Sequence, residues 1–123
     1  MLKTVCIDHI NMVVKNLDES VRFYSDLFGF VVKKDQAEKD SVIIGDEHVK
    51  LCLYEGEDAG DRKGILHFGI NVANFDEALD MCKTLGVPVK YNGILEWEKS
   101  RSIYIEDPNG YEIELSEVKG GGL

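Results

Sequence analysis

A short pattern occurs twice in this chain, and the duplication limits the folds open to it. The first copy, HINMVVKNLDE, begins at His9, and the second, HFGINVANFDE, begins at His67. In each copy the histidine opens an apolar run, and an asparagine, Asn16 or Asn74, introduces an acidic pair. Such repetition indicates two copies of one structural unit, with the histidines at equivalent positions. A pseudo-twofold arrangement would bring the two imidazoles together, as a metal site requires.

Hydrophobic periodicity and end signals predict the same elements in both copies. The first copy predicts a strand at 7–14, a helix at 16–28 and strands at 30–34, 41–45 and 49–54. The second predicts a strand at 66–72, a helix at 74–85 and strands at 87–91, 101–105 and 112–116. Asn16 with Glu19, and Asn74 with Glu77, are the predicted N-terminal caps. Gly29 and Gly86 are the predicted C-terminal stops.

The predicted fold class is therefore α+β, with two tandem βαβββ units that form curved mixed sheets carrying helices on their convex side. A chain of 123 residues, 44% of them hydrophobic, can bury one core but not two independent ones. We expect a single domain over 1–123, with repeats at about 5–54 and 65–117. The charged, glycine-containing segment 55–64 is the expected linker, and 118–123 is an expected disordered tail.

Charge and cysteine content narrow the partners and the compartment. The net charge of −9 disfavours nucleic acid and anionic membranes, because 23 acidic residues would repel phosphates. No run approaches the ~18 apolar residues of a membrane span, and the start of the chain has no signal-peptide pattern. Three cysteines without CxxC spacing fit a reducing cytoplasm. We expect a cytoplasmic protein that binds neither nucleic acid nor a membrane.

Strand alternation sorts the side chains into an apolar back and a polar front. The front of the second half then carries Ser102, Tyr104, Glu112 and Glu114, with Ile103, Ile113 and Leu115 behind. The front of the first half carries His9, Asn11, Lys50 and Cys52. A sheet face lined in this way is typical of a site rather than of a core.

The two βαβββ units, the strand-initial His9 and His67, and the final DPNGYEIEL segment (107–115) resemble the vicinal oxygen chelate superfamily, over residues 7–117. This superfamily includes glyoxalase I, fosfomycin-resistance thiol transferases, extradiol dioxygenases and bleomycin-resistance proteins. By that resemblance His9, His67 and Glu114 match the three metal ligands. Two imidazoles and one carboxylate suit Zn, Ni, Co, Mn or Fe as divalent ions and leave positions open for a bidentate substrate.

The resemblance implies a small metal-dependent lyase or isomerase, with the metal as Lewis acid. Glu112 or Glu114 would move the proton, with Tyr104 as hydrogen-bond partner. The expected substrate-binding residues are Asn11, Lys50, Asn71, Ser102 and Trp97. Single-module members of the family commonly dimerise, some by exchanging βαβββ units, so a homodimer is expected.

Departures from the family's subtypes leave alternatives open. Glyoxalase I carries a fourth ligand, a carboxylate, where the best match here is Lys50, which cannot donate a lone pair; a register shift would bring in Glu47 or His48. The loop 91–100 has no serine-rich stretch and the tail has no arginine, which disfavours fosfomycin. The three ligands disfavour a purely sequestering role, and the chain is short for an extradiol dioxygenase. The alternatives are a non-catalytic antibiotic- or metabolite-binding protein, and a dioxygenase or thiol transferase.

Overall fold

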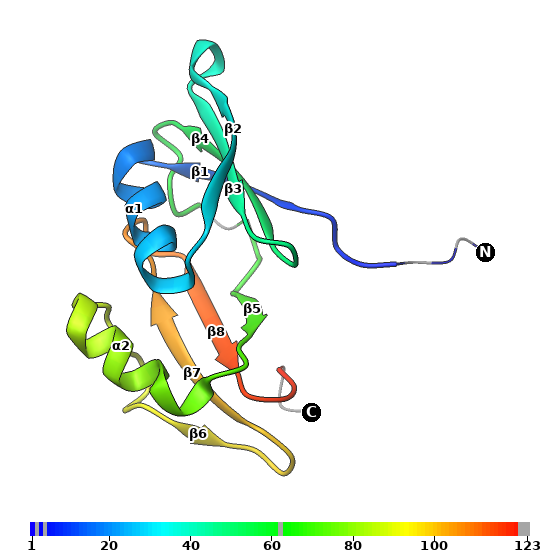
Figure 1. Ribbon diagram of the computed structural model, residues 1–123, viewed down its shortest axis with the longest axis vertical. Helices are drawn as coiled ribbons and strands as arrows, with labels where there is room; N and C mark the ends of the chain where they lie inside the picture. Colours follow the sequence, from blue (N-terminus) through cyan, green and yellow to red (C-terminus); the bar gives the residue numbers. More distant parts are fainter. Residues whose placement is uncertain (2, 4, 62, 121–123) are drawn as a thin grey trace. The chain divides into compact units, whose positions relative to one another are not determined.

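A computed structural model of the chain describes residues 1, 3, 5–61 and 63–120, and it divides into two compact units, Met1–Asp61 and Arg62–Leu123. Each unit contains one four-stranded mixed sheet and one α-helix (Figure 1). The α+β class and the duplicated βαβββ order are thereby confirmed. In the described part of the chain, no helix has the length and apolar character needed to cross a bilayer.

The first unit runs β1 (Ile10–Val14), α1 (Leu17–Phe28), β2 (Val31–Gln36), the 3-10 turn η1 (Ala37–Lys39), β3 (Ser41–Gly45) and β4 (Lys50–Glu55). Its strand order is β1-β4-β3-β2, with β1 parallel to β4 and the other pairs antiparallel. Helix α1 packs against β3 and β4 and buries Tyr24 completely. Its ends are as predicted: Asn16 Oδ1 accepts from the Glu19 amide at 2.8 Å, and Gly29 is left-handed with φ of 72°.

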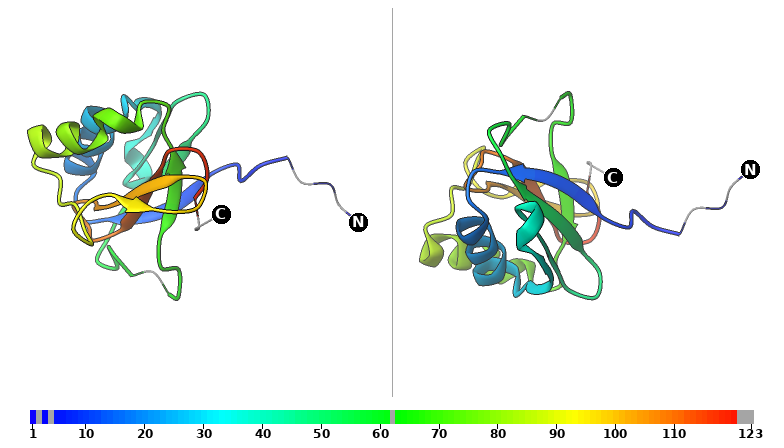
Figure 2. Two further views of the ribbon diagram at one scale, coloured as in Figure 1. Left: turned by 90° about the horizontal axis from the view of Figure 1, so that it is seen from below. Right: turned by 90° about the horizontal axis from the view of Figure 1, so that it is seen from above.

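Strand β1 begins three residues later than predicted, at Ile10, because its pairing with β4 begins at Leu51. His9 therefore stands just ahead of the strand. The chain before it runs on from β1 as extended backbone, with Val5 and Ile7 exposed (Figure 2).

The second unit runs β5 (Phe68–Asn71), η2 (Phe75–Glu77), α2 (Ala78–Leu85), β6 (Leu95–Glu96), β7 (Arg101–Glu106) and β8 (Glu112–Ser116). Its strand order, β5-β8-β7-β6, repeats that of the first unit, again with the first strand parallel to the last. A tight turn beginning at Asp107 joins β7 to β8: Asp107 Oδ1 accepts from the amides of Asn109 and Tyr111 at 2.8 and 2.9 Å.

The prediction of a strand at 87–91 is wrong. That segment makes a single bridge, between Val89 and Ile105, and the edge strand β6 lies later, at Leu95–Glu96. Tyr91 and Asn92 both adopt positive φ, 54° and 64°, which turns the chain out of the extended conformation. The short segment 87–91 thus ends in a turn before it can form a ladder.

The predicted cap of the second helix is also wrong. Asn74 makes no capping hydrogen bond to the backbone; its Nδ2 instead donates to the Glu77 carboxylate at 2.8 Å. The first turn is the 3-10 segment η2, and α2 begins only at Ala78. The predicted stop at Gly86 is confirmed, with φ of 68°.

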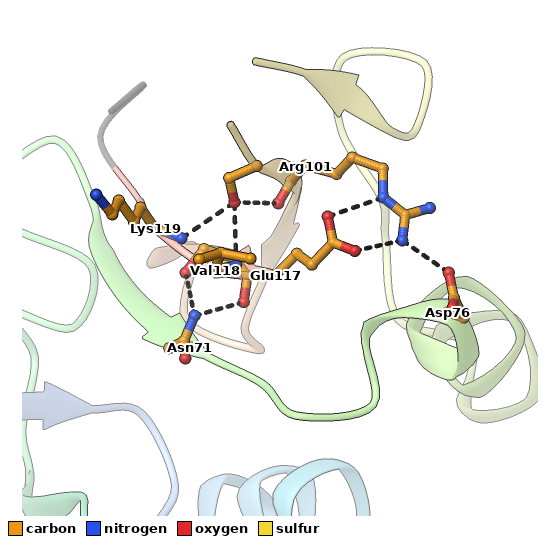
Figure 3. A network of polar contacts seen from close by, with 8 residues as sticks. Asn71, Asp76, Arg101, Glu117, Val118 and Lys119 are labelled. Carbon is orange, nitrogen blue, oxygen red and sulfur yellow. Dashed lines mark hydrogen bonds and ion pairs between the residues drawn. The ribbon is translucent and has the colours of Figure 1, made fainter. Parts of the chain in front are cut away.

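A polar network holds the segment after β8 against β7 (Figure 3). Arg101 donates to both Glu117 oxygens, at 3.0 and 2.6 Å, and to Asp76 at 2.8 Å. Ser100 Oγ accepts from the amides of Val118 and Lys119, at 3.0 and 3.1 Å. These two residues, expected in a disordered tail, are thus hydrogen-bonded, whereas 121–123 lie outside the described residues.

This network predicts an acid-dependent loss of stability. The hydrogen bond from Arg101 lowers the pKa of Glu117 below its usual 4.5, so the stabilisation is complete above about pH 4.5 and is lost as the pH falls through the folded-state value. Between pH 7 and pH 3 the melting temperature should therefore fall less steeply in Arg101→Gln than in the native chain. Thermal melts at pH 3, 4, 5 and 7 measure this, and parallel curves would contradict it.

Candidate metal and substrate site

The second unit brings two of the predicted metal ligands together. The β5–β8 register pairs Gly69 with Glu114, and His67 precedes β5 on the same side of the sheet. His67 Nε2 lies 3.2 Å from Glu114 Oε2. The carboxylate is buried, with 1% of its side chain exposed, and the imidazole is 30% exposed. The pair therefore forms a buried oxygen donor beside an accessible nitrogen donor.

Two further predicted site residues form hydrogen bonds that fix the other oxygen of the Glu114 carboxylate, Oε1. Ser102 Oγ donates to Glu114 Oε1 at 2.8 Å, and the Trp97 indole N–H donates to Ser102 Oγ at 2.6 Å. Ser102 is completely buried. Ser102 and Trp97, which the sequence predicts to bind substrate, form a hydrogen-bonded relay that fixes the Glu114 carboxylate.

Removing this relay should destabilise the second unit. Ser102→Ala leaves a buried carboxylate oxygen and an indole N–H without these partners, which costs roughly 1–3 kcal/mol of unfolding free energy. The matched control is Ser41→Ala, because Ser41 is equally buried but donates to the neutral amide of Gln36 at 3.0 Å. Urea unfolding followed by Trp97 fluorescence measures the first change, and far-UV circular dichroism the second. Equal losses of unfolding free energy in the two variants would contradict a special contribution from the hydrogen bond of Ser102 to a charged carboxylate.

Glu112, the second predicted carboxylate, lies on the other side of the imidazole. Its Oε2 accepts from Lys90 Nζ at 2.7 Å and from Tyr91 Oη at 2.9 Å, and its Oε1 lies 3.8 Å from His67 Nδ1. Burial raises the pKa of Glu112, but the hydrogen bonds from Lys90 and Tyr91 outweigh it, so this pKa lies below its usual value. Sequence reasoning missed Lys90 and Tyr91 because it placed both in a strand.

Tyr104 pairs with Glu114 across β7 and β8, and its ring meets His67 edge to face with centroids 5.2 Å apart. Burial and the negative charge of Glu114 raise the pKa of Tyr104 to about 12. Its hydroxyl therefore keeps its proton at neutral pH. This agrees with the predicted role of hydrogen-bond partner, in which a phenol donates to a substrate oxygen.

Two predicted site residues of the first unit, His9 and Lys50, lie beside Asp8, which sequence reasoning missed. His9 Nδ1 lies 2.6 Å from one Asp8 oxygen, and Lys50 Nζ lies 3.3 Å from both. The hydrogen bond to His9, followed by that from Lys50, lowers the pKa of Asp8. Asp8 precedes the repeated pattern, where the second copy has Leu66, so the repeat gave no signal for it.

The hydrogen-bond register of the two sheets corrects the position at which a fourth ligand was expected. Strand β1 pairs Asn11 with Cys52 as β5 pairs Gly69 with Glu114. The residue that repeats Glu114 is therefore Cys52, which is buried, and Lys50 repeats Glu112 instead. The first unit therefore has no carboxylate at the position equivalent to Glu114, as predicted, but the residue there is Cys52 and not Lys50.

The remaining predicted residues differ in their surroundings. Asn11 is exposed on β1, and Asn71 donates to the carbonyl and hydroxyl oxygens of Ser116, at 3.0 and 3.2 Å. Among the described residues no three His, Cys, Asp or Glu side chains form a metal-ligating group. The second unit supplies the pair His67 and Glu114, and His9 belongs to the first unit.

Known proteins resemble this chain, some in sequence and others in fold. A probable chloroplastic lactoylglutathione lyase of Arabidopsis thaliana is 30% identical over 89% of this chain, which spans only 35% of that protein. Fosfomycin resistance protein FosX of Listeria innocua is 27% identical, over 95% of this chain and 90% of its own. A crystal structure of FosX from Listeria monocytogenes superposes with a TM-score of 0.80 at 21% identity, over 96% of this chain and 94% of that chain.

A second structure of that FosX, complexed with Mn(II) and a sulfate ion, has a TM-score of 0.78 at 22% identity, over 96% of this chain and 94% of that chain. The family model described as Glyoxalase/Bleomycin resistance protein/Dioxygenase superfamily matches residues 6–115. That match runs from the residues before β1 to the penultimate residue of β8, and so takes in both repeats. The chain belongs to the glyoxalase/bleomycin resistance protein/dioxygenase superfamily.

Proposed function

We propose that this chain is a metal-dependent enzyme whose divalent ion is held by His9, His67 and Glu114. The observation that carries the proposal is the 3.2 Å separation of His67 Nε2 and Glu114 Oε2. Two ligands each about 2.1 Å from one ion lie roughly 3.0 Å apart at a right angle and roughly 3.4 Å apart at a tetrahedral angle. The donors also suit the chemistry, since first-row divalent metals accept imidazole nitrogen and carboxylate oxygen. The Mn(II) complex of FosX supports the same class of ion.

The proposed reaction is lyase or isomerase chemistry on a small substrate with vicinal oxygens. A divalent ion bound there supplies Lewis-acid activation of those oxygens. The Tyr104 hydroxyl, protonated at neutral pH, donates a hydrogen bond to a substrate oxygen beside Glu114. Of the carboxylates proposed to move the proton, Glu114 is fixed at Oε1 by Ser102, and Glu112 is paired with Lys90.

Metal-reconstituted protein should be screened against hemithioacetals, catechols and epoxides, with fosfomycin among the epoxides. The absent serine-rich loop and tail arginine speak against fosfomycin, but the resemblance to FosX along nearly the whole chain places it in the panel. Turnover that depends on added metal supports the enzyme. Tight binding of a panel compound without turnover, in protein that holds no metal, would instead favour the non-catalytic binding module.

We further propose a homodimer in the cytoplasm. The outer strands β1 and β2 of one sheet, and β5 and β6 of the other, expose backbone groups, and the extended segment before β1 exposes Val5 and Ile7 almost fully. Dimer formation would cover such edges, side by side or by exchange of units through the segment 55–64. Free thiols at Cys6, Cys52 and Cys82 support a reducing compartment.

Sedimentation at micromolar concentration is expected to give twice the 13.8 kDa chain mass. A monomer with metal binding intact would show that one chain forms the site alone.

A further inference from the structure

The second unit contains an ion pair between Lys90 and Glu112 whose effect on His67 the proposed chemistry does not use. Glu112 is 7% exposed and sits at the start of β8. Its Oε2 accepts from both Lys90 and Tyr91, on the segment before β6. A carboxylate that accepts two hydrogen bonds at one oxygen cannot rotate freely, so the direction of its other oxygen is fixed. That oxygen, Oε1, faces His67.

The imidazole of His67 lies between two carboxylates, one at each ring nitrogen. Nε2 is 3.2 Å from Glu114 Oε2, and Nδ1 is 3.8 Å from Glu112 Oε1. A neutral imidazole has one nitrogen that donates and one that accepts, and a metal binds the nitrogen that carries the lone pair. A ligating histidine therefore needs an acceptor at its other nitrogen, which sets both the ring orientation and the hydrogen position.

We infer that Glu112 is a positioning residue, which holds the His67 ring with Nδ1 toward its own carboxylate and Nε2 toward Glu114. The metal part of this inference rests on the proposed function, whereas the ring placement does not. Lys90 and Tyr91 fix Glu112, and the edge of the Tyr104 ring confines the imidazole plane. Glu112, predicted from sequence as a proton carrier, thus acts through His67.

The chain offers a matched control for this inference. Glu106 also pairs with Lys90, at 3.5 Å, but its side chain is 42% exposed, and the carboxylates that lie beside His67 in the described part of the chain are those of Glu112 and Glu114. Glu112→Gln and Glu106→Gln each remove one carboxylate charge from Lys90 and preserve side-chain shape. Only the first removes the acceptor facing Nδ1. Tyr91→Phe removes one of the two hydrogen bonds that fix Glu112 while keeping the ring that contacts Tyr104.

The first measurement uses metal-free protein. Nuclear Overhauser contacts between the His67 and Tyr104 rings should be strong in the native chain and in Glu106→Gln. They should weaken several-fold in Glu112→Gln, with a smaller loss in Tyr91→Phe. The amide spectrum of each variant verifies folding. Ring contacts that persist unchanged in folded Glu112→Gln would overturn the inference, whatever the metal does.

The second measurement is a competitive Zn(II) titration of the same proteins. Loss of an acceptor behind a ligating histidine typically weakens metal affinity by roughly 10- to 100-fold, so Glu112→Gln should weaken Zn(II) binding by that factor and Glu106→Gln by less than about twofold. Equal affinities in the native chain and Glu112→Gln would overturn the metal part. A native chain that binds no Zn(II) but loses its ring contacts in Glu112→Gln would sink the proposed metal site and leave the positioning role standing.

Discussion

Replacing His67 with alanine is expected to abolish metal retention. The native chain should hold about one divalent ion after loading and desalting, and the variant none, because it loses the imidazole nitrogen that lies beside the Glu114 carboxylate. A carboxylate and a single remaining imidazole leave too few protein ligands to retain a first-row ion through desalting. Elemental analysis of the desalted proteins measures the stoichiometry.

The control for this experiment is His48→Ala. His48 is an exposed histidine in the turn between β3 and β4, and its backbone amide donates to Asp46 Oδ1 at 2.7 Å. It should retain the ion fully. His9→Ala tests the third proposed ligand and should reduce retention as His67→Ala does. One equivalent of metal retained by His67→Ala would place the ion elsewhere.

The repeat predicted most of the fold because its signals are local. Asn16 and the glycines Gly29 and Gly86 act within one turn of their own helix, so the pattern alone located three of the four helix ends. The fourth failed because Asn74 has another acceptor within reach, the Glu77 carboxylate. A capping pattern cannot tell which of two nearby hydrogen bonds a side chain will make.

The sheet face on which each side chain lies was predictable from the sequence, but the contacts between those side chains were not. Alternation placed Ser102, Tyr104, Glu112 and Glu114 on one face, and the structure keeps them together in the second unit. The contacts that decide their roles depend on where the chain turns back. Lys90 reaches Glu112 because the chain turns at Tyr91 instead of continuing as a strand.

The same limit explains the error over the fourth ligand. The loops between strands differ in length in the two copies, so counting along the chain cannot align β4 with β8. The hydrogen-bond register can, and it aligns Cys52 rather than Lys50 with Glu114.

The first unit should be most sensitive to a single methyl group at Gly45. This residue ends β3 at the turn into β4, and the Val49 carbonyl, which accepts from the Asp46 amide at 3.0 Å, lies directly over it. A Cβ at Gly45 would stand 2.0 Å from that oxygen. Backbone cannot rotate away as a side chain can, so Gly45→Ala must open the turn, at an expected cost of ~3 kcal/mol or more in unfolding free energy.

Gly29→Ala is the comparison that separates contact from conformation. Gly29 is left-handed, with φ of 72°, but a Cβ there would meet nothing within 4 Å. Its replacement should cost only about 1 kcal/mol, the strain of an alanine in that backbone region. Urea titration followed by amide-resolved NMR of β3 and β4 measures both variants within the same unit. Equal losses would mean that the turn between β3 and β4 yields easily, and that its close approach at Gly45 does not fix the β3–β4 register, which sets Ile43 beside Cys52.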